Sequence, residues 1–174
     1  MNPGSASGSD TPKDMLQRFD AESLGLLSRL LTQRRQAVLA TLDPSGAPYT
    51  AMVAFAAEAG LGGILVHLSG LSAHKGHLLA DPRCSLLVFE PDNGHVEILQ
   101  HARVSLGCRA ELLAKDGPDF APARERYLAK YPGHKLMFGL GDFDLLRLRP
   151  ESGLMNAGFG RAFAVTPADL AAAG

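Results

Sequence analysis

Apolar and polar positions recur with two different periods along this chain. Leu24, Leu27 and Leu31 are spaced like one face of a helix, which predicts an amphipathic helix that begins near Ala21. Short runs of apolar and β-branched residues between turn residues predict strands instead. The expected strands are residues 36–42, 47–55, 64–68, 84–89, 101–113 and 143–148, and a last extended segment covers 154–165.

Turn and breaker residues show how these elements are connected. Asp43-Pro-Ser-Gly46 has the residue types of a tight turn, so the first two strands are expected to form a hairpin. A short helix is expected over 72–80, because Asp81-Pro82 disfavours its continuation. A second helix is expected over 118–131, and Thr166 is expected to cap a final helical turn. Gly107 is a candidate bulge in its strand.

The short connections predict an antiparallel sheet with flanking helices rather than a βαβ fold. We expect the sheet to close into a barrel, in a single domain over residues 21–174. Residues 1–20 are expected to form a flexible tail, because the first twelve are rich in Gly, Ser and Asp. They resemble no signal peptide, which favours a cytoplasmic protein.

Composition narrows the function classes. The 174 residues carry 17 Lys and Arg against 18 Asp and Glu, a net charge of −1, and no Trp. No nucleic-acid partner is therefore expected. No apolar run approaches the roughly 20 residues of a transmembrane helix, so no membrane association is expected. Cys84 and Cys108 form no CxxC pair, and we interpret both as buried, reduced thiols.

The stretch from His67 to His77 is the most informative for chemistry. A strand ends there, a Ser/Gly turn follows, and Ser72 occupies a natural N-cap position. Helix N-termini attract anions. A bound phosphate is one interpretation of this turn, and a capped helix with a solvated basic turn is the alternative. The candidate anion-binding residues are Ser69, Ser72, His74 and Lys75.

Other candidates are weaker. His74 and His77 share one helix face, but the spacing suggests no third ligand, so no metal site is predicted. Arg103 lies inside a strand and must face solvent or find a partner. Arg161, in Gly-Phe-Gly-Arg-Ala, sits beside two backbone-permissive glycines, which allows close approach to a ligand or another chain. No residue is singled out as catalytic.

Several ordered motifs resemble the pyridoxamine 5′-phosphate oxidase-like FMN-binding split barrels. They are Ala37-Val-Leu-Ala-Thr-Leu-Asp-Pro-Ser-Gly-Ala-Pro-Tyr49, Ser69-Gly-Leu-Ser-Ala-His-Lys75 and Leu78-Leu-Ala-Asp-Pro-Arg-Cys-Ser-Leu-Leu-Val88. Two C-terminal stretches are closer to the haem-utilisation (HugZ-type) branch, namely Phe143-Asp-Leu-Leu-Arg-Leu-Arg-Pro150 and Asn156-Ala-Gly-Phe-Gly-Arg-Ala162.

The resemblance implies a six-stranded, Greek-key-like split barrel that forms a homodimer, with FMN at the dimer interface. It implies flavin contacts from the second strand, at Thr50, Met52 and Val53. It also implies that the phosphate lies at Ser69, Ser72, His74 and Lys75, and that Arg103 faces the flavin ring.

Two departures from the family pattern change the expected activity. Ala51 stands where classical oxidases carry a phosphate-binding Arg, and Arg147-Leu-Arg149 lacks the His of their substrate motif. We therefore expect an FMN-dependent oxidoreductase that acts on a small molecule other than vitamin B6. The alternatives are a haem-binding or haem-degrading protein of the HugZ type, for which the C-terminal segment offers Met155 but no His as an axial ligand, and a cofactor-free barrel for a small ligand.

Overall fold

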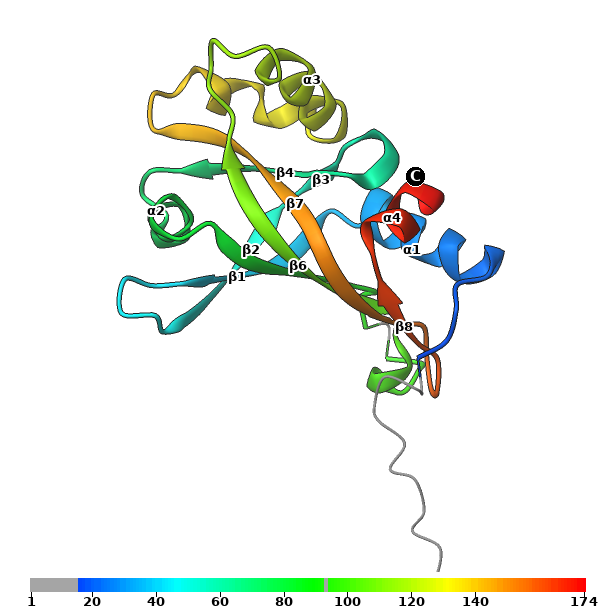
Figure 1. Cartoon of the computed structure of the whole chain (residues 1–174). Coiled ribbons are helices and arrows are strands. Elements are labelled where there is room, and N and C mark those ends of the chain that lie inside the picture. The colour runs from blue at the N-terminus through cyan, green and yellow to red at the C-terminus, as the bar shows by residue number, and fades with distance from the viewer. Residues whose placement is uncertain (1–15, 93) are drawn as a thin grey trace, which may run out of the picture.

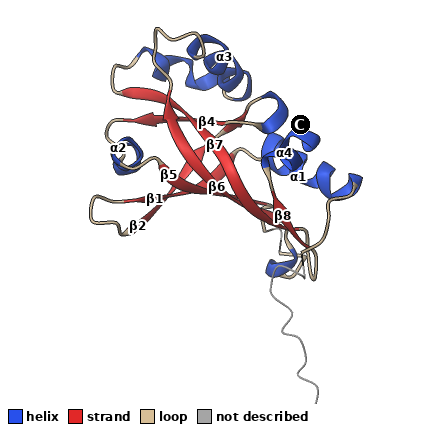
Figure 2. Cartoon of the chain, in the orientation of Figure 1, coloured by secondary structure: helices blue, strands red, loops and turns tan. Residues whose placement is uncertain are grey.

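The computed structural model describes residues 16–92 and 94–174, and most of the expected N-terminal tail lies outside these ranges. The described part is a strongly curled antiparallel sheet with helices around its rim (Figure 1, Figure 2). The strands are β1 (Gln36–Leu42), β2 (Pro48–Ala54), β3 (Ala56–Ala57), β4 (Ile64–Ser69), β5 (Arg83–Phe89), β6 (Arg103–Leu112), β7 (Phe143–Asn156) and β8 (Ala162–Val165).

The strand order explains why the sheet curls. Neighbouring strands follow the order β2-β1-β5-β6-β7-β4-β3, and β8 pairs with β7. Only Phe55 separates β2 from β3, so the chain itself joins the two edges of the sheet. The predicted antiparallel barrel with flanking helices is confirmed.

The described sheet has eight strands, whereas the resemblance implied six. β7 is one strand of 14 residues, and β6 pairs with its residues 146–156. The register shifts between Gly107 and Cys108, but the extra residue is Glu151 of β7, so the bulged strand is β7 rather than the strand of Gly107, where a bulge was expected. A bulge increases local twist and lets two long strands stay paired while they bend. The remaining additions are the two-residue β3 and the terminal β8.

Helices cap the ends and one outer face of the sheet. They are α1 (Ala21–Gln33), α2 (Ala73–Ala80), α3 (Phe120–Lys130) and α4 (Pro167–Ala173), with short 3-10 turns η2 (Ala59–Leu61), η3 (Ile98–Gln100) and η4 (Pro132–Gly139). Asp20 and Ser23 form a capping box at the start of α1, and Thr166 caps α4 as predicted. Gln17 pairs with Phe163 of β8, so the chain just before α1 lies against the barrel.

The core has two parts. Inside the barrel, Leu27, Leu30 and Leu31 of α1 are at most 1% exposed. Each fully buried leucine contributes roughly 1.5–3 kcal/mol of transfer free energy. A second cluster lies outside the barrel, where Tyr127 of α3 and the C-cap residue Tyr131 pack over Leu65 of β4 and Leu145 of β7. In the described ranges, no helix is both long and apolar enough to span a bilayer.

Candidate functional site

One face of the sheet is uncovered and partly apolar. The register places Met52, Val38, Leu87, Ser105 and Leu154 opposite one another across five strands. The next row of partners contains Leu39, Leu86 and Leu106, which are fully buried inside the barrel. Successive side chains of a strand point to opposite faces, so the row with Met52 points outward. Met52 is 72% exposed and Leu154 is 43% exposed.

Of the three β2 residues expected to contact flavin, only two lie on this outer face. Thr50 and Met52 are exposed and point outward. Val53 is buried and pairs with Ala37, which is also buried in the core. The structure therefore brings Thr50 and Met52 together on the outer face and places the Val53 side chain in the barrel core.

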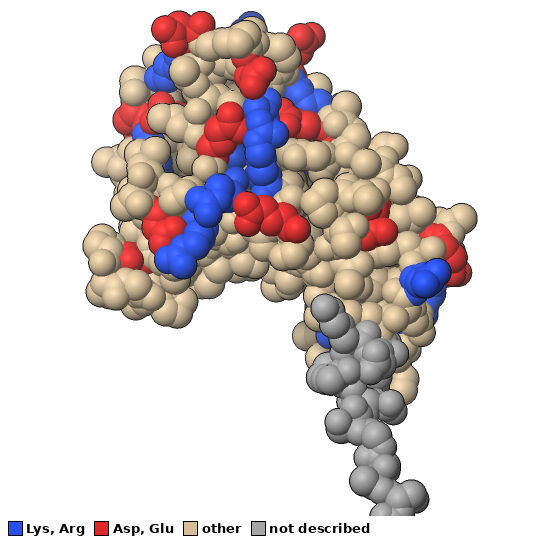
Figure 3. Space-filling view, viewed as in Figure 1, with Lys and Arg blue, Asp and Glu red and all other residues tan. Residues whose placement is uncertain are grey.

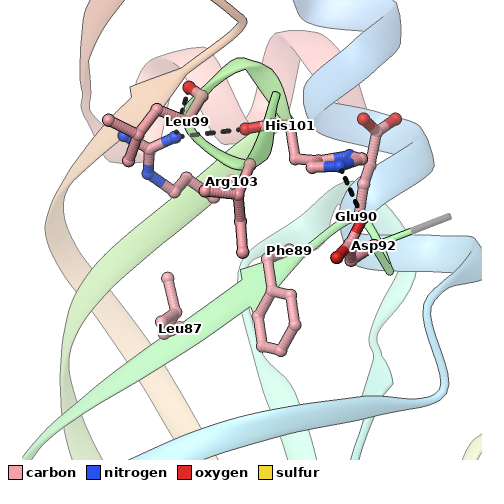
Figure 4. A pocket seen from close by; sticks show the side chains of 8 residues that line it. Leu87, Phe89, Glu90, Asp92, Leu99, His101 and Arg103 are labelled. Atoms are coloured by element: carbon pink, nitrogen blue, oxygen red, sulfur yellow. Dashed lines mark hydrogen bonds and ion pairs between the residues drawn. The ribbon is translucent and has the colours of Figure 1, made fainter. Parts of the chain in front are cut away.

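A groove with apolar walls lies on this outer face, at the end of β5 and the start of β6 (Figure 4). Its volume is about 270 Å³. The residues that line it are Leu87, Phe89, Glu90, Asp92, Ile98, Leu99, His101 and Arg103. We refer to it as the β5–β6 groove. Leu87, Phe89 and Arg103 come from the two strands, and the others come from the connection between them.

Arg103 is held at the edge of the β5–β6 groove by main-chain acceptors. Its Nη1 donates hydrogen bonds to the carbonyl oxygens of Leu99, at 3.0 Å, and His101, at 3.2 Å. Within the described residues it forms no ion pair with a carboxylate, so its positive charge is not neutralised. The sequence left open whether Arg103 faces solvent or a partner, and the structure gives it a half-buried position with fixed orientation.

His101 is the one imidazole among the described residues that line this groove. It is 8% exposed, and its Nε2 lies 3.5 Å from Oδ1 of Asp92. No hydrogen bond satisfies this buried nitrogen within the described part of the chain. Buried polar atoms without partners are uncommon, and they are often found at functional sites.

The turn before α2 is organised by two aspartates rather than left open. Ser69 Oγ donates to Oδ2 of Asp142 at 2.7 Å. Lys75 Nζ lies 2.6 Å from Oδ2 of Asp144 and donates to the carbonyl oxygen of Asp142 at 2.6 Å. Lys75 is 8% exposed. Its charge is therefore already neutralised, inside the contact between α2 and the start of β7.

The other two members of the expected phosphate site offer little positive charge. Ser72 is the N-cap of α2, as predicted, but its side chain makes no capping hydrogen bond. Burial, together with the nearby His77, lowers the pKa of His74 below the usual 6.5. His74 is then neutral at pH 7. His77 itself contacts Thr41, whose Oγ1 lies 3.1 Å from the imidazole Nδ1. The role of these residues in phosphate binding stays a prediction.

The structure also shows residues that sequence reasoning did not single out. Asp142 and Asp144 had the pattern of ordinary loop-to-strand residues, and only their distance in space from Lys75 gives them a role. The outward orientation of Leu87 and Phe89 could have been predicted, because they alternate with buried residues in one strand. The haem-ligand candidate Met155 is fully buried in the barrel core.

Charged side chains gather on one part of the face in Figure 3, over β6 and β7 near α3. Arg147 of β7 is a buried arginine with three carboxylate partners, Glu58, Glu111 and Asp119. It binds Glu58 through two hydrogen bonds of 2.8 Å and Asp119 through one of 3.0 Å. Arg149 pairs with Glu111. These arginines hold β7 to neighbouring segments and are not available to a ligand.

The fold and the comparisons agree on the class of protein. A curled antiparallel sheet with its edges joined through β2 and β3 is a split barrel. The family model described as pyridoxamine 5′-phosphate oxidase matches residues 26–156. The chain belongs to this family, and the resemblance noted from the sequence is confirmed.

Its relatives include proteins named for haem. Heme oxygenase HutZ of Vibrio cholerae is 28% identical over 142 residues, which cover 79% of this chain and 78% of HutZ. The non-canonical heme oxygenase HOZ of Arabidopsis thaliana chloroplasts is 33% identical over 118 residues, which cover 68% of this chain and 34% of HOZ.

Among solved structures, a heme binding protein from Mycobacterium smegmatis superposes with a TM-score of 0.76 at 27% identity. The match covers 90% of this chain and 62% of that one. The chain thus spans about one third of HOZ and somewhat less than two thirds of the mycobacterial protein.

Proposed function

We propose that this protein binds haem in the β5–β6 groove, as a homodimer whose interface includes the outer face of the sheet. The observation that carries the proposal is the combination in the groove of apolar walls and one uncompensated cation, Arg103. Haem is a flat apolar ring with two carboxylates on one edge. It requires apolar contact surface and cationic or N–H donors, which Leu87, Phe89, Leu99 and Arg103 offer.

The chemistry of the other candidate cofactor supports the same choice. FMN carries a phosphate with about two negative charges, which needs a cationic pocket. In the expected phosphate site, Lys75 is paired with Asp144 and His74 is neutral. Adding a phosphate beside Asp142 and Asp144 would place like charges together. FMN binding and flavin-dependent oxidation therefore become the second hypothesis.

Five of the eight groove residues have a role in this proposal. Arg103 pairs with a propionate, and the leucines and Phe89 exclude water from the ring. His101 is the nearest candidate for an axial ligand, because its Nε2 has no hydrogen-bond partner in the described chain. Haem would supply the iron centre, and the protein would position it and limit solvent access. Degradation of the bound haem, as in the names of both curated relatives, is a further part of the proposal.

The same surface supports the proposed homodimer. The outer face carries Met52, Val38, Leu87 and Leu154 in one cross-strand row, with no helix drawn over it in Figure 2. A second copy that covers this row would bury the exposed parts of these side chains. It would also close the β5–β6 groove, whose Leu87 belongs to the row.

The test is a titration of purified protein with haem and, separately, with FMN, followed by visible absorption and gel filtration. We expect a Soret band that stays with the protein. Arg103→Met should weaken haem affinity by about tenfold, the equivalent of about 1.4 kcal/mol. Arg109→Met is the matched control, because Arg109 lies on the same strand and pairs with Glu151 outside the groove.

Equal haem affinity in the Arg103 and Arg109 variants would contradict the groove assignment. Retained FMN without a Soret band would support the flavin hypothesis instead. If neither ligand is retained, the cofactor-free barrel is the correct interpretation. Loss of the Soret band after addition of ascorbate in air would support haem degradation, and a stable band would leave haem binding alone.

A further inference from the structure

A second cavity, which shares no lining residue with the β5–β6 groove, is bordered by cations. It lies between α1, β3 and α3 and has a volume of about 220 Å³. The residues that line it are Thr32, Ala56, Ala57, Arg126, Ala129 and Lys130. We refer to it as the α1–α3 cavity. Three of its six residues are alanines, so the space is left by small side chains.

The ammonium group of Lys130 has no polar partner in the described chain. Its Nζ is buried, without a hydrogen bond, 4.2 Å from the centre of the Phe55 ring. The charged groups that act on it are Arg35 and Arg126, both positive. Burial and these two arginines lower the pKa of Lys130 to about 8. An ammonium buried beside two guanidinium groups is unfavourable unless an anion is present.

The two arginines are held in place by contacts that do not neutralise them. Arg126 Nε donates to the carbonyl oxygen of Ala57 at 2.8 Å. Arg35 stacks over the ring of Tyr131, 4.9 Å from its centre. Tyr131 in turn lies within hydrogen-bond distance of the carbonyl oxygens of Arg35 and Phe55. Within the described residues, no carboxylate forms an ion pair with Arg35, Arg126 or Lys130.

The C-terminal ends of α1 and α3 offset part of this charge through their dipoles. They do not supply an acceptor to Lys130 Nζ, which remains unsatisfied. A cavity with an orphan ammonium and a fixed guanidinium at its wall has the donors that an oxyanion needs. Two adjacent positive charges match an anion with two negative charges better than one with a single charge.

We propose that the α1–α3 cavity binds a small dianionic oxyanion of the phosphate type, through Lys130 Nζ and the Arg126 guanidinium. The site is independent of the proposed haem groove, since the two share no lining residue. The phosphate group is either the free ion or part of a small ester.

The experiment measures binding by calorimetry and thermal unfolding of the full chain at constant ionic strength. The probes are inorganic phosphate, glycerol 2-phosphate and acetate. We expect both phosphate compounds to bind and to raise the melting temperature, and acetate to bind at least about tenfold more weakly. Tighter binding of glycerol 2-phosphate than of inorganic phosphate would identify an ester as the ligand, and the reverse order would identify the free ion.

Variants separate a site from general charge attraction. Lys130→Met keeps the apolar stem over Phe55 and should lower phosphate affinity by about tenfold or more, while raising the melting temperature of the ligand-free protein. Arg126→Gln should also lower the affinity. Lys135→Met, an exposed lysine on η4, removes one charge outside the cavity and should leave binding unchanged. Absence of phosphate binding, equal binding of acetate, or unchanged affinity in Lys130→Met would each overturn the proposal.

Discussion

Lys75 and Asp144 form a largely buried ion pair that joins α2 to the start of β7, with 2.6 Å between Nζ and Oδ2. The side chain of Lys75 is 10% exposed and that of Asp144 is 27% exposed. A charge in this position has a structural partner before any ligand arrives. Removal of one partner lowers the stability of the folded protein by more than the pair's net contribution to it, because the remaining charge is left unpaired.

The first prediction concerns this pair. Lys75→Met and Asp144→Asn should each lower the free energy of unfolding by about 1–3 kcal/mol, and the double variant by less than the sum. Urea unfolding of the four proteins measures the coupling. Lys115→Met is the control, because Lys115 is half exposed and 3.9 Å from the same carboxylate, so its effect should stay below about 0.5 kcal/mol. Loss of FMN binding with unchanged stability in Lys75→Met would instead assign Lys75 to a phosphate site.

The second prediction concerns Arg147, which is 8% exposed and bonded to Glu58 and Asp119. Arg147→Met should destabilise the protein by about 2–4 kcal/mol, since it leaves these carboxylates without their partner. Arg147→Lys should recover only part of this loss, because an ammonium cannot make the paired bonds to Glu58. Arg149→Met is the control, because Arg149 and its partner Glu111 are both about half exposed. If this variant lowers the free energy of unfolding by more than about 1 kcal/mol, burial of the ion pair does not explain the effect of Arg147.

The third prediction is a pH dependence. Burial, and then the nearby His134, lowers the pKa of His67 from 6.5 to about 4. The unfolded chain therefore binds a proton between pH 6.5 and 4 that the folded protein does not, so stability falls as the pH drops through this window. The loss should reach about 1–2 kcal/mol after allowance for the half-buried position of the ring.

His67→Phe should remove this part of the acid destabilisation and keep the stacking on Phe138, whose ring centre lies 3.8 Å away. Chemical unfolding at pH 7.5, 5.5 and 4 measures the difference between the variant and the natural protein. The two should respond alike above pH 6.5. A gap that stays constant across the three pH values would rule out His67 as the titrating group.

The fourth prediction tests the proposed dimer. Met52→Glu places a charge at the most exposed apolar position of the cross-strand row and should convert a dimer into a monomer in sedimentation experiments. Leu136→Glu is the matched control, because Leu136 is 85% exposed on η4 and lies outside this face. Haem affinity should fall in Met52→Glu if the partner closes the groove. A natural protein that sediments as a monomer would contradict the dimer directly.

The local pattern of apolar, polar and turn residues was sufficient to predict most of the helices and strands. The turn residues Asp43 to Gly46 and the helical spacing of Leu24, Leu27 and Leu31 depend on neighbours in sequence, and the structure confirms both. Alternation of apolar residues likewise gave the strand positions. The length of β7 could not be predicted, because its central residues, Arg149 to Gly153, lack an apolar pattern. They remain extended because β6 pairs with them.

For the candidate site, the sequence determined which residue types were present, and the tertiary structure decided which of them are free. The position of Lys75 in the first turn of a helix is typical of an anion ligand, but in the folded protein Lys75 pairs with Asp144, which lies 69 positions later in the sequence. Arg103 and Lys130 had the same charge in the sequence, but only the fold shows that neither meets a carboxylate in the described chain. Local periodicity reflects interactions between near neighbours, whereas charge compensation depends on residues that only the folded barrel brings together.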